Sequence, residues 1–445
     1  MILVVDLDET FLKNDFFAET LLQQLLRKPL GTFRLFQDNK HNWVGFKETI
    51  LSEASIPFDI SSLIDPNVQE WINTNKYRFS KTVLVSASPD SFVKKLVSPL
   101  GVFDEIHGST TINLKGTAKR DFIQAKWETD FAYIGDSRSD TPIFQAAAEP
   151  IKVQSLRPES NKLKLFVSLI RTNNWIKNLL IFLPFLLAHR FSFPQFISLI
   201  LGFFSLSFMA SACYIINDVL DIPNDRLHTE KRNRPLAAAQ LSTTQAMIWC
   251  GLLTGISIAL AFILDIRLLP WVLLYGLVSM MYSLYLKKIR FIDILILTGF
   301  YMFRVFFGGE LSETELTGWF VSTMAMSVFA LACSKRYLEL LFSDKETLLG
   351  RAYTKEDMPM LQLLMYNFSV GAILLLNVHA YFVLMIRSPY FFLFLNLLAI
   401  AILLFYFDTR NKKADDPVQR VTRSLPLIIF VLLFLGLYFF EMIQH

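Results

Sequence analysis

The stretch "NDVLDIPNDRLHTEKRNRP", residues 217–235, follows directly on the uncharged run "ISLILGFFSLSFMASACYII", residues 197–216. The uncharged run is long enough to cross a membrane as a helix. If that helix continues, Asn217, Asp221 and Asp225 lie on one face, because residues four apart are neighbours on a helix surface. Stacked carboxylates repel one another unless a cation lies between them, and Mg²⁺ bound to a substrate polyphosphate is such a cation. The acids therefore indicate a Mg²⁺-polyphosphate site at the edge of a membrane.

The same stretch carries a further acid, Asp218, and a set of basic or titratable side chains: Arg226, His228, Lys231, Arg232 and Arg234. An ordinary basic loop on the cytoplasmic side explains the bases, because such loops are enriched in Lys and Arg. It does not explain the acids. Arg and Lys at this place can also hold phosphate oxygens directly, and Pro223 allows a kink in the helix.

The composition places the chain among membrane proteins. Of its 445 residues 53% are hydrophobic, 42 are Phe, and the mean hydropathy is +0.41. These values are too high for a soluble protein of this length. A net charge of +4 is small and argues against nucleic-acid binding. Cys213, Cys250 and Cys333 lie apart in apolar runs, which favours buried hydrophobes over a disulfide or metal set.

Nine apolar segments of the C-terminal part are expected to span the membrane, and several approach the ~20 residues that a spanning helix needs. They lie at about 175–190, 194–216, 243–264, 268–286, 292–311, 316–334, 358–386, 390–409 and 424–443. With the N-terminus inside, the inner loops carry 17 Lys and Arg, and the outer loops carry 3, namely Arg190, Arg267 and Arg387. This ratio predicts a cytoplasmic N-terminus and an external C-terminus.

Residues 1–155 are expected to form an α/β domain. The runs "MILVVD", "KTVLVSAS" and "FAYIGD" are apolar and end in polar residues, which is typical of buried parallel strands. The first of them is no signal peptide, because no basic segment precedes it. Residues 16–75 are helical sequence inserted after the first strand, residues 156–174 are a linker or a helix lying in the membrane interface, and residues 175–445 form the membrane part.

Polar residues follow these strands at the edge where parallel sheets bind ligands. "DLDET" supplies Asp6 and Asp8, of which one carboxylate can attack phosphorus while the other moves a proton. Two carboxylates beside a phosphate require a cation, for which Mg²⁺ is the usual choice. Further candidates lie in "YIGDSRSD", "LVSAS" and "NLKGTAKRDF": the acids Asp136 and Asp140, the hydroxyls of Ser86 and Ser88, and the cations Lys119 or Lys115.

In this order the four motifs resemble the haloacid dehalogenase superfamily of phosphohydrolases, over essentially all of residues 1–150. The resemblance implies a Rossmann-like domain with residues 16–75 as a helical cap. It implies that Asp6 is the nucleophile that forms an aspartyl-phosphate and Asp8 the general acid/base. Ser86 and Lys119 would hold the phosphate, and Asp136 with Asp140 would complete the Mg²⁺ site. Glu9 stands where many members have Gly; an inactive scaffold is the alternative interpretation.

The stretch 217–235 closely resembles the aspartate-rich signature of the UbiA-type intramembrane prenyltransferase superfamily. The resemblance, over about residues 162–443, implies nine transmembrane helices and a Mg²⁺-diphosphate site at Asp218, Asp221 and Asp225. Ordinary members carry a second motif, DxxxD, after the sixth span, but "SKRYLELLFSDKETLLGRAYTKED", residues 334–357, lacks it.

Three stretches resemble instead the decaprenyl-phosphate phosphoribosyltransferase branch: "NWIKNLLIFLPFL", "DRLHTEKRNRPLA" and "YSLYLKKIRFIDILILTGFYMFR". That branch implies phosphoribosyl pyrophosphate as donor and a polyprenyl phosphate as acceptor. A basic second site suits a lipid phosphate better than an acidic one. The substrate-binding candidates of the membrane part are Lys177, Asn217, Arg226, His228, Lys231, Arg234, Tyr282, Lys287, Asp293, Arg304, Lys335, Arg336 and Arg351, with Lys288 and Arg290 nearby. For Arg304, inside a span, function and packing remain equal alternatives.

The sequence thus predicts a bifunctional, Mg²⁺-dependent multi-pass enzyme of a bacterial inner membrane. The membrane part would transfer 5-phosphoribosyl from phosphoribosyl pyrophosphate to the lipid phosphate, and the N-terminal domain would remove the 5-phosphate. One alternative is an aromatic prenyltransferase that uses a polyprenyl diphosphate, as in quinone biosynthesis. Another is a non-catalytic lipid-binding scaffold. The sequence leaves open whether the protein forms a homo-oligomer.

Overall fold

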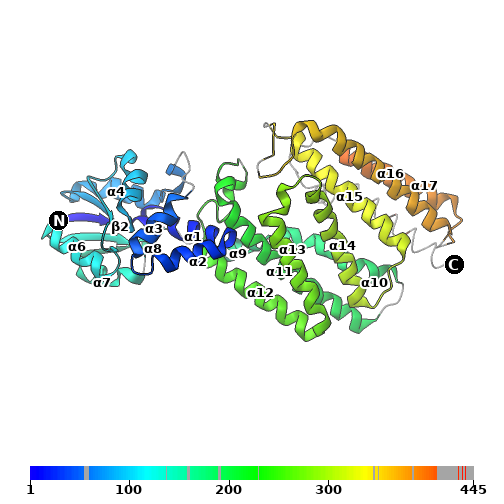
Figure 1. The fold of residues 1–445 in the computed structure, drawn as a ribbon, viewed down its shortest axis with the longest axis horizontal. Helices are drawn as coiled ribbons and strands as arrows, with labels where there is room; N and C mark the ends of the chain where they lie inside the picture. Colours follow the sequence, from blue (N-terminus) through cyan, green and yellow to red (C-terminus); the bar gives the residue numbers. More distant parts are fainter. Residues whose placement is uncertain are drawn as a thin grey trace. The chain divides into compact units, whose positions relative to one another are not determined.

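A computed structural model of the chain describes residues 1–54, 60–136, 138–157, 161–188, 192–228, 230–343, 346–348, 350–382 and 385–407, with Ile429, Leu433 and Gly436 (Figure 1). The chain divides into two compact units. The first comprises Met1–Arg171 and Tyr214–Leu252, and the second comprises Thr172–Cys213 and Leu253–His445.

The first unit is built on a five-stranded parallel sheet, which confirms the predicted parallel α/β arrangement. Its strands, in spatial order, are β3 (Glu105–Ser109), β2 (Thr82–Pro89), β1 (Ile2–Val5), β4 (Phe131–Gly135) and β5 (Glu149–Lys152). The chain runs outward from β1 to β3 and then returns to place β4 beside β1, with Val5 opposite Ile134. The strand order therefore reverses between β1 and β4, and such a switch point leaves a crevice at the carboxyl ends of the strands.

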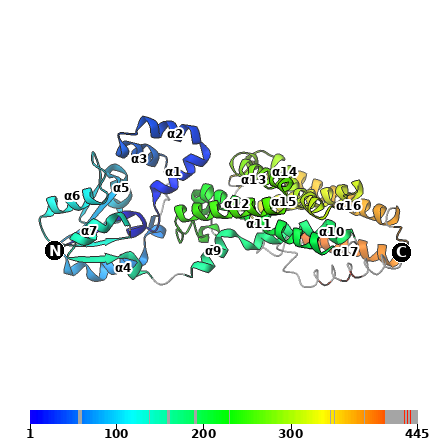
Figure 2. The ribbon, with the colours of Figure 1, turned by 90° about the horizontal axis from the view of Figure 1, so that it is seen from below.

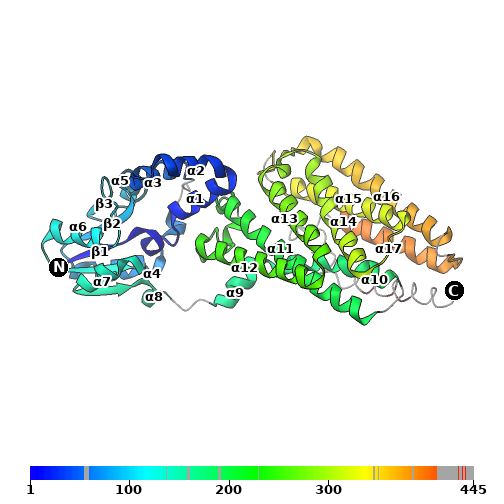
Figure 3. The same cartoon turned by 60° about the horizontal axis from the view of Figure 1, so that its bottom comes forward.

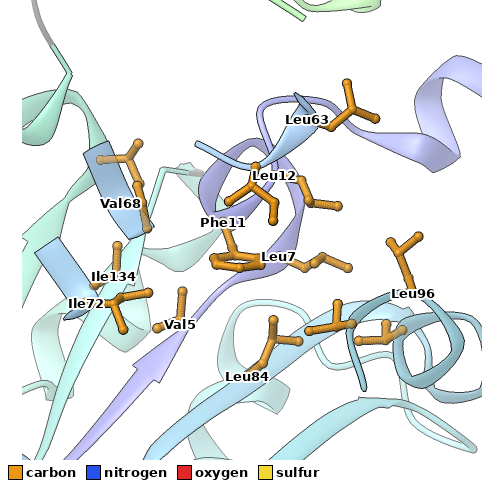
Figure 4. Packing of buried hydrophobic residues seen from close by; sticks show 14 of the residues in the cluster. Val5, Leu7, Phe11, Leu12, Leu63, Val68, Ile72, Leu84, Leu96 and Ile134 are labelled. Carbon is orange, nitrogen blue, oxygen red and sulfur yellow. The ribbon is translucent and has the colours of Figure 1, made fainter. Parts of the chain in front are cut away.

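Both faces of the sheet are covered, and the central strands β1, β2 and β4 alternate their side chains between two cores. Leu3 and Val5 point into one core, which also contains residues of α4 (Pro66–Asn75) and α5 (Asp90–Val97). Figure 4 shows this packing around Phe11. Ile2 and Val4 point into the other core, beneath α6 (Thr117–Trp127) and α7 (Thr141–Ala146).

Residues 16–75 are helical where the structure describes them. The helices are α1 (Phe16–Arg27), α2 (Pro29–Asp38), α3 (Trp43–Ser52) and α4, labelled in Figures 1 and 2. Local sequence fixes their starts: Asp15 accepts a hydrogen bond from the backbone N–H of Ala18 at 2.9 Å and caps α1. Asp65 caps α4 in the same way, with Pro66 at the first helical position. The short helix α8 (Val153–Leu156) follows β5, and α9 (Lys162–Ile170) lies in the predicted linker.

Long apolar helices make up most of the remaining chain. They are α11 (Phe193–Arg226), α12 (Thr243–Leu264), α13 (Leu269–Leu284), α14 (Ile292–Ser312), α15 (Gly318–Leu341), α16 (Met358–Phe382) and α17 (Pro389–Phe407). Helices α15 and α16 run side by side (Figures 1 and 3). Within the described ranges, five segments are long and apolar enough to cross a membrane: 193–226, 243–264, 266–284, 292–312 and 355–382.

Nine spans are therefore not confirmed. The first expected span, 175–190, is a 3-10 helix (Thr172–Phe182) followed by the five-residue α10 (Leu183–Leu187) where it is described. Pro184 lacks a backbone N–H and so cannot extend an α-helix from the preceding turn. The ninth expected span, 424–443, and the bases counted at Arg190, at Lys345 and from Arg410 to Arg423 lie outside the described residues.

Candidate functional site

Three acids gather at the switch point of the sheet. Asp6 follows β1 directly, and its Oδ1 accepts hydrogen bonds from the Leu7 N–H at 2.9 Å and from Lys119 Nζ at 2.7 Å. Asp136 follows β4, which pairs with β1. Asp8 lies two residues beyond Asp6 in the same loop, where the backbone leaves the strand. The parallel sheet thus brings together the strand-end acids as the sequence predicted.

Burial controls the charge state of this site. Desolvation raises the pKa of Asp8 well above its ordinary value, and the charges of Asp15 and Asp6 raise it further. Desolvation also raises the pKa of Asp136. Lys119 is 1% exposed, and its Nζ also donates to the Tyr133 hydroxyl at 3.3 Å. The arrangement places a buried cation on Asp6, and burial opposes the charged form of Asp8 unless a cation lies beside it.

Hydroxyl groups from β2 complete the floor of the site. Ser88 Oγ donates to Asp8 Oδ2 at 2.8 Å, and Ser86 Oγ lies 3.5 Å from the same oxygen. The backbone N–H of Ser88 donates to Ser86 Oγ at 3.0 Å, which orients that hydroxyl.

The insert contributes a cation, Lys47, that the sequence analysis did not identify. Lys47 of α3 is buried, and its Nζ donates to the Ala87 carbonyl at 2.7 Å and to Asn113 Oδ1 at 3.2 Å. Burial lowers the pKa of Lys47, while the charges of Asp8 and Asp15 act in the opposite direction. No motif identified Lys47, because one Lys in a helical insert has no distinctive spacing.

The residues at the switch point fit a Mg²⁺ ion. Asp8 Oδ1 and Asp136 Oδ1 are buried and accept no hydrogen bond, so each retains an oxygen that a cation could use. Asp140 is buried in the turn after β4, on the same side of the strand end. Across the described ranges no group of three His, Cys, Asp or Glu forms a closed metal cage. Mg²⁺ does not need one, since it commonly binds one or two carboxylates, waters and substrate phosphate.

The loop after β1 has a strained backbone at Glu9, which adopts φ 56° and ψ 8°. This left-handed region favours glycine, so the side chain of Glu9 adds strain at this place. Arg157 fixes the loop: it donates to the Glu9 carbonyl at 2.9 Å and to Asp65 Oδ2 at 2.5 Å, and it lies 3.8 Å from Asp136.

The second acidic group lies at the end of α11, within the first unit. Asn217 Nδ2 donates to Asp221 Oδ2 at 3.0 Å, one helical turn away, as the spacing predicted. Arg234 donates to Asp225 Oδ2 at 2.6 Å and to Asp218 Oδ1 at 3.4 Å. Arg234 thus offsets the charge repulsion between Asp218 and Asp225.

A second arginine completes this group. Arg171, the residue after α9, donates to the same oxygen of Asp218. Its guanidinium also lies 5.4 Å from the Tyr214 ring centroid. Arg171 and Arg234 both donate to Asp218. Phosphate oxygens of a substrate can replace the carboxylates at these guanidiniums. The carboxylates are then available to bind a metal ion. A pair of acids with a substrate diphosphate is enough for Mg²⁺.

Helix α1 of the insert contacts the same end of α11. Pro223 lies inside α11 and has no N–H to give to the carbonyl of Val219, four residues earlier. Gln23 Nε2 donates to that carbonyl at 3.0 Å, and Arg27 donates to the next one, Leu220, at 2.9 Å. The insert therefore satisfies backbone acceptors at the proline of the aspartate-rich stretch.

Arg226 lies in this contact as well. It donates to Glu19 at 3.0 and 2.7 Å and to the Ala237 carbonyl at 3.1 Å, and both side chains of the ion pair are 7% exposed. Burial raises the pKa of Glu19, and Arg226 partly offsets that rise. Arg226 was expected to bind substrate; a phosphate would have to displace Glu19 to reach it.

A separate charge cluster lies within the second unit. Asp293 is fully buried and accepts hydrogen bonds from Tyr282 at 2.7 Å, Arg351 at 2.8 Å and Arg336. Arg336 also donates to Glu339 at 2.5 Å. The predicted basic site thus contains two arginines, whose charges two acids balance. The side chain of Arg351 is 23% exposed, whereas that of Arg336 is fully buried.

Arg304 lies inside α14 and is 4% exposed. Its Nε donates to Asn178 Oδ1 at 2.7 Å, and a terminal nitrogen donates to the Tyr275 hydroxyl at 3.1 Å. A further bond goes to the Phe300 carbonyl. Neutral oxygens therefore satisfy this buried charge, a partner set that the sequence did not indicate.

The remaining candidates lie at several places. His228 follows α11, where its Nδ1 accepts from the Glu230 N–H at 3.2 Å, and Lys231 is exposed in the next turn. Lys177 is half-buried in the 3-10 helix Thr172–Phe182, and Lys335 is half-buried in α15. Lys287 is buried just after α13.

Comparison with known proteins identifies relatives of the membrane part and one relative whose match extends into the N-terminal part. A family model described as "UbiA prenyltransferase family" matches residues 179–432. The "Uncharacterized protein y4nM" of Sinorhizobium fredii is 28% identical over 381 residues, which cover 80% of this chain and 74% of that protein. The "Decaprenyl-phosphate phosphoribosyltransferase" of Mycolicibacterium smegmatis is 30% identical over 193 residues. That match covers 42% of this chain and 61% of the relative's length.

Among solved structures, one described as "Structure of a UbiA homolog from Archaeoglobus fulgidus bound to GPP and Mg2+" is similar, with a TM-score of 0.48 and 19% sequence identity. The match covers 62% of this chain and 99% of that one.

Proposed function

The chain belongs to the UbiA prenyltransferase family, and on this premise we propose that its membrane part is a phosphoribosyltransferase. It would transfer 5-phosphoribosyl from phosphoribosyl pyrophosphate to a polyprenyl phosphate. The observation that carries the proposal is the pairing of Asp218 and Asp225 with Arg234, and of Asp218 with Arg171. Such a group offers both carboxylates for a metal and guanidiniums for a diphosphate. The relative of M. smegmatis has a name that matches this reaction.

In the proposed reaction an oxygen of the lipid phosphate attacks C1 of the ribose. The bond between C1 and the pyrophosphate oxygen breaks, and pyrophosphate leaves. Asp218, Asp221 and Asp225 would hold Mg²⁺, which supplies charge stabilisation to the leaving group. Arg171 and Arg234 would bind phosphate oxygens directly. Asn217 positions Asp221 through its side-chain hydrogen bond.

The lipid phosphate needs a second, cationic site. The proposed members are Arg351 and Arg336 with Tyr282 and Asp293, together with Lys177, Lys287, Arg304 and Lys335. His228 and Lys231, within the aspartate-rich stretch 217–235, are proposed to bind the pyrophosphate. Arg351 is the leading candidate for direct contact, because it is more exposed than Arg336.

Purified protein tests the transferase. With radiolabelled phosphoribosyl pyrophosphate, polyprenyl phosphate and Mg²⁺, we expect a labelled lipid, and we expect Asp221→Asn to abolish it. A parallel reaction offers a polyprenyl diphosphate and an aromatic acceptor. Product in that second reaction alone would replace our proposal with an aromatic prenyltransferase.

For the N-terminal domain we propose a phosphohydrolase that removes the 5-phosphate from the lipid-linked ribose. The supporting observation is the site itself: Lys119 on Asp6, and Asp8 and Asp136 with unpartnered buried oxygens. An oxygen of Asp6 would attack phosphorus to form an aspartyl-phosphate, while Asp8 protonates the departing ribose oxygen. Water would then hydrolyse the aspartyl-phosphate, with Asp8 as base and Ser86 and Lys119 holding the phosphate.

An Asp6→Asn protein tests this second activity. We expect it to accumulate the phosphorylated lipid product, whereas the wild type releases inorganic phosphate from it. Equal phosphate release from both proteins would remove the assignment. The transferase reaction, measured in the same samples, shows that the variant is folded.

The apolar helices and the family indicate an integral membrane protein. We propose nine spans in a bacterial inner membrane, with the N-terminal domain in the cytoplasm and the C-terminus outside. Protease added to right-side-out and inverted vesicles tests the orientation: only inverted vesicles should lose the N-terminal domain.

A further inference from the structure

The insert carries an exposed apolar surface next to basic residues. Its large apolar side chains are exposed by 40 to 76% and belong to α1, α2 and the start of α3: Leu25, Leu30, Phe33, Phe36 and Trp43. We name these five residues the insert patch. Leu30, Phe33 and Phe36 are three residues apart on α2 and so share one side of the helix, on which Thr32 is buried next to them. Contiguous exposed apolar surface of this kind marks an interaction site.

Aromatic rings pack against one another at the centre of the patch. The rings of Phe36 and Trp43 lie 6.4 Å apart in an edge-to-face arrangement, and Phe46 lies 5.2 Å from Trp43 and 5.7 Å from Phe36. Aromatic pairs at such centroid distances attract one another. The exposed rings of Phe36 and Trp43 therefore form one group.

The charges around the patch have one dominant sign. Residues 25–43 contain four Lys or Arg and one Asp, a net charge of +3. Lys28, Arg34 and Lys40 are exposed between the apolar side chains. Aromatic and aliphatic residues on one face, with Lys and Arg at its border, are the composition of helices that lie in a lipid headgroup layer.

The insert contacts the end of a candidate membrane span. Arg27 ends α1 and donates to the Leu220 carbonyl of α11, and α2 begins two residues later at Pro29. Helix α11 is long and apolar enough to cross a membrane. At 1.5 Å per residue, Leu220 lies about 40 Å along α11 from Phe193, which is more than the ~30 Å thickness of the hydrocarbon core of a bilayer. The contact at Leu220 is therefore close to the polar end of this span.

We propose that the insert patch binds the surface of the lipid bilayer, with a preference for anionic phospholipid. The contact between α1 and the aspartate-rich end of α11 continues into this surface, so that α1 and α2 together seat the N-terminal domain on the membrane. The occupant is lipid rather than a second protein, because the patch joins the end of a spanning helix and carries the charge opposite to anionic headgroups.

This contact would connect the bilayer with the phosphohydrolase candidate. Trp43 begins α3, and Lys47 lies one turn later on the same helix, where it reaches the strand that carries Ser86 and Ser88. Trp43 of the patch and Lys47 beside the site are thus four residues apart, about 6 Å along α3. A headgroup held at the patch would be close to the site, which suits a lipid-linked substrate; this consequence rests on the proposed function, whereas the lipid contact does not.

Fluorescence of a label in the full chain tests the proposal. The three native cysteines are replaced by Ala, and an environment-sensitive NBD label is attached at Phe33→Cys or, as control, at Tyr77→Cys. Tyr77 is 86% exposed and lies in the 3-10 turn Lys76–Arg78, outside the patch. Both proteins are reconstituted in vesicles of phosphatidylcholine, with or without phosphatidylglycerol, that contain lipids with a quenching doxyl group.

We expect doxyl lipid to quench the label at position 33 but not the label at position 77. We expect aqueous iodide to quench the label at position 77 but not the label at position 33. Quenching at position 33 should increase with phosphatidylglycerol. Iodide quenching at both positions would mean a free surface and would overturn the proposal. A label at position 33 that neither quencher reaches would mean that protein covers the patch, and this result would overturn it too. Both outcomes leave the proposed enzyme activities untouched.

Discussion

Glu19 and Arg226 are 207 residues apart in sequence and form a two-point ion pair at 3.0 and 2.7 Å. Glu19 belongs to a helix of the N-terminal insert, and Arg226 ends the aspartate-rich helix α11. The pair therefore connects the two candidate chemistries, because the same helix end carries Asp218 and Asp225. A change at this pair should influence the transferase, although neither residue needs to touch substrate.

We expect Glu19→Gln to destabilise the protein by about 3–5 kcal/mol, since it leaves the buried Arg226 charge without its partner. It should also raise the KM for phosphoribosyl pyrophosphate more than it lowers kcat. Thermal unfolding in detergent and steady-state kinetics measure both. The double variant Glu19→Arg with Arg226→Glu should recover much of the loss. If the double variant stays as impaired as Glu19→Gln, while the exposed control Glu53→Gln has the stability and KM of the wild type, Arg226 binds substrate instead.

Mg²⁺ should stabilise the N-terminal site. Asp8 and Asp136 each hold a buried oxygen without a hydrogen-bond partner, so metal binding would remove an electrostatic penalty. At 100 times its dissociation constant, Mg²⁺ should stabilise the folded protein by about 2.7 kcal/mol. Asp136→Asn should reduce the shift in Tm. An unchanged shift in this variant would place the metal elsewhere.

The ion pairs of Glu105 give a prediction for acid stability. A hydrogen bond from Lys81 and one from His107 lower the pKa of Glu105 from 4.5 to about 2. Because the folded-state pKa is lowered, the charged carboxylate stabilises the fold above pH 4.5, and this contribution disappears as the pH falls to about 2. Glu105 and His107 are partly exposed and Lys81 is about half exposed, so solvent screens these pairs and the effect is small.

Glu105→Gln should therefore be slightly less stable than the wild type at pH 7, and the two proteins should converge as the pH falls from 4.5 to 2. Chemical denaturation in detergent over this range measures the difference. A gap that widens toward low pH would contradict the assignment.

Arg304, which we propose for the lipid-phosphate site, depends on Asn178 for its position in α14. Asn178→Ala removes the acceptor of the Arg304 Nε hydrogen bond and leaves a buried charge short of a partner. The expected loss of stability is about 1–3 kcal/mol. The matched control is Asn377→Ala, which breaks a neutral contact with Asn396 at 3.2 and 3.0 Å and should cost less, about 0.6 kcal/mol. Equal losses in the two variants would show that the Arg304 charge does not depend on Asn178.

The sequence predicted those parts of the fold that depend on local pattern. Strands β1, β2 and β4 are buried on both faces, so their continuous apolar runs were recognisable. Strands β3 ("EIHGS") and β5 ("EPIK") are the edges of the sheet and carry polar residues. They contain no continuous apolar run from which a strand could have been predicted. The UbiA resemblance is confirmed, while the resemblance of residues 1–150 to phosphohydrolases stays a prediction.

The candidate sites, like the fold, could be predicted only in part. Asp6, Asp8 and Asp136 could be grouped because parallel strands bring their carboxyl ends together. The partners of Arg226 and Arg304 could not be predicted, because Glu19 and Asn178 are 207 and 126 residues away from them. Contacts over such separations depend on tertiary packing and leave no periodic signal in the sequence.

The division of the chain bears on how the protein is made. The first unit consists of Met1–Arg171 and Tyr214–Leu252, so its parts are interrupted by residues that belong to the other unit. At about 5–20 residues per second, a ribosome needs roughly 3–11 s to proceed from Thr172 to Arg226 at the end of α11. During that interval α1 has been synthesised, but the segment that accepts its hydrogen bonds has not. The nascent N-terminal domain must therefore wait, with Glu19 unpaired, until the end of α11 has emerged.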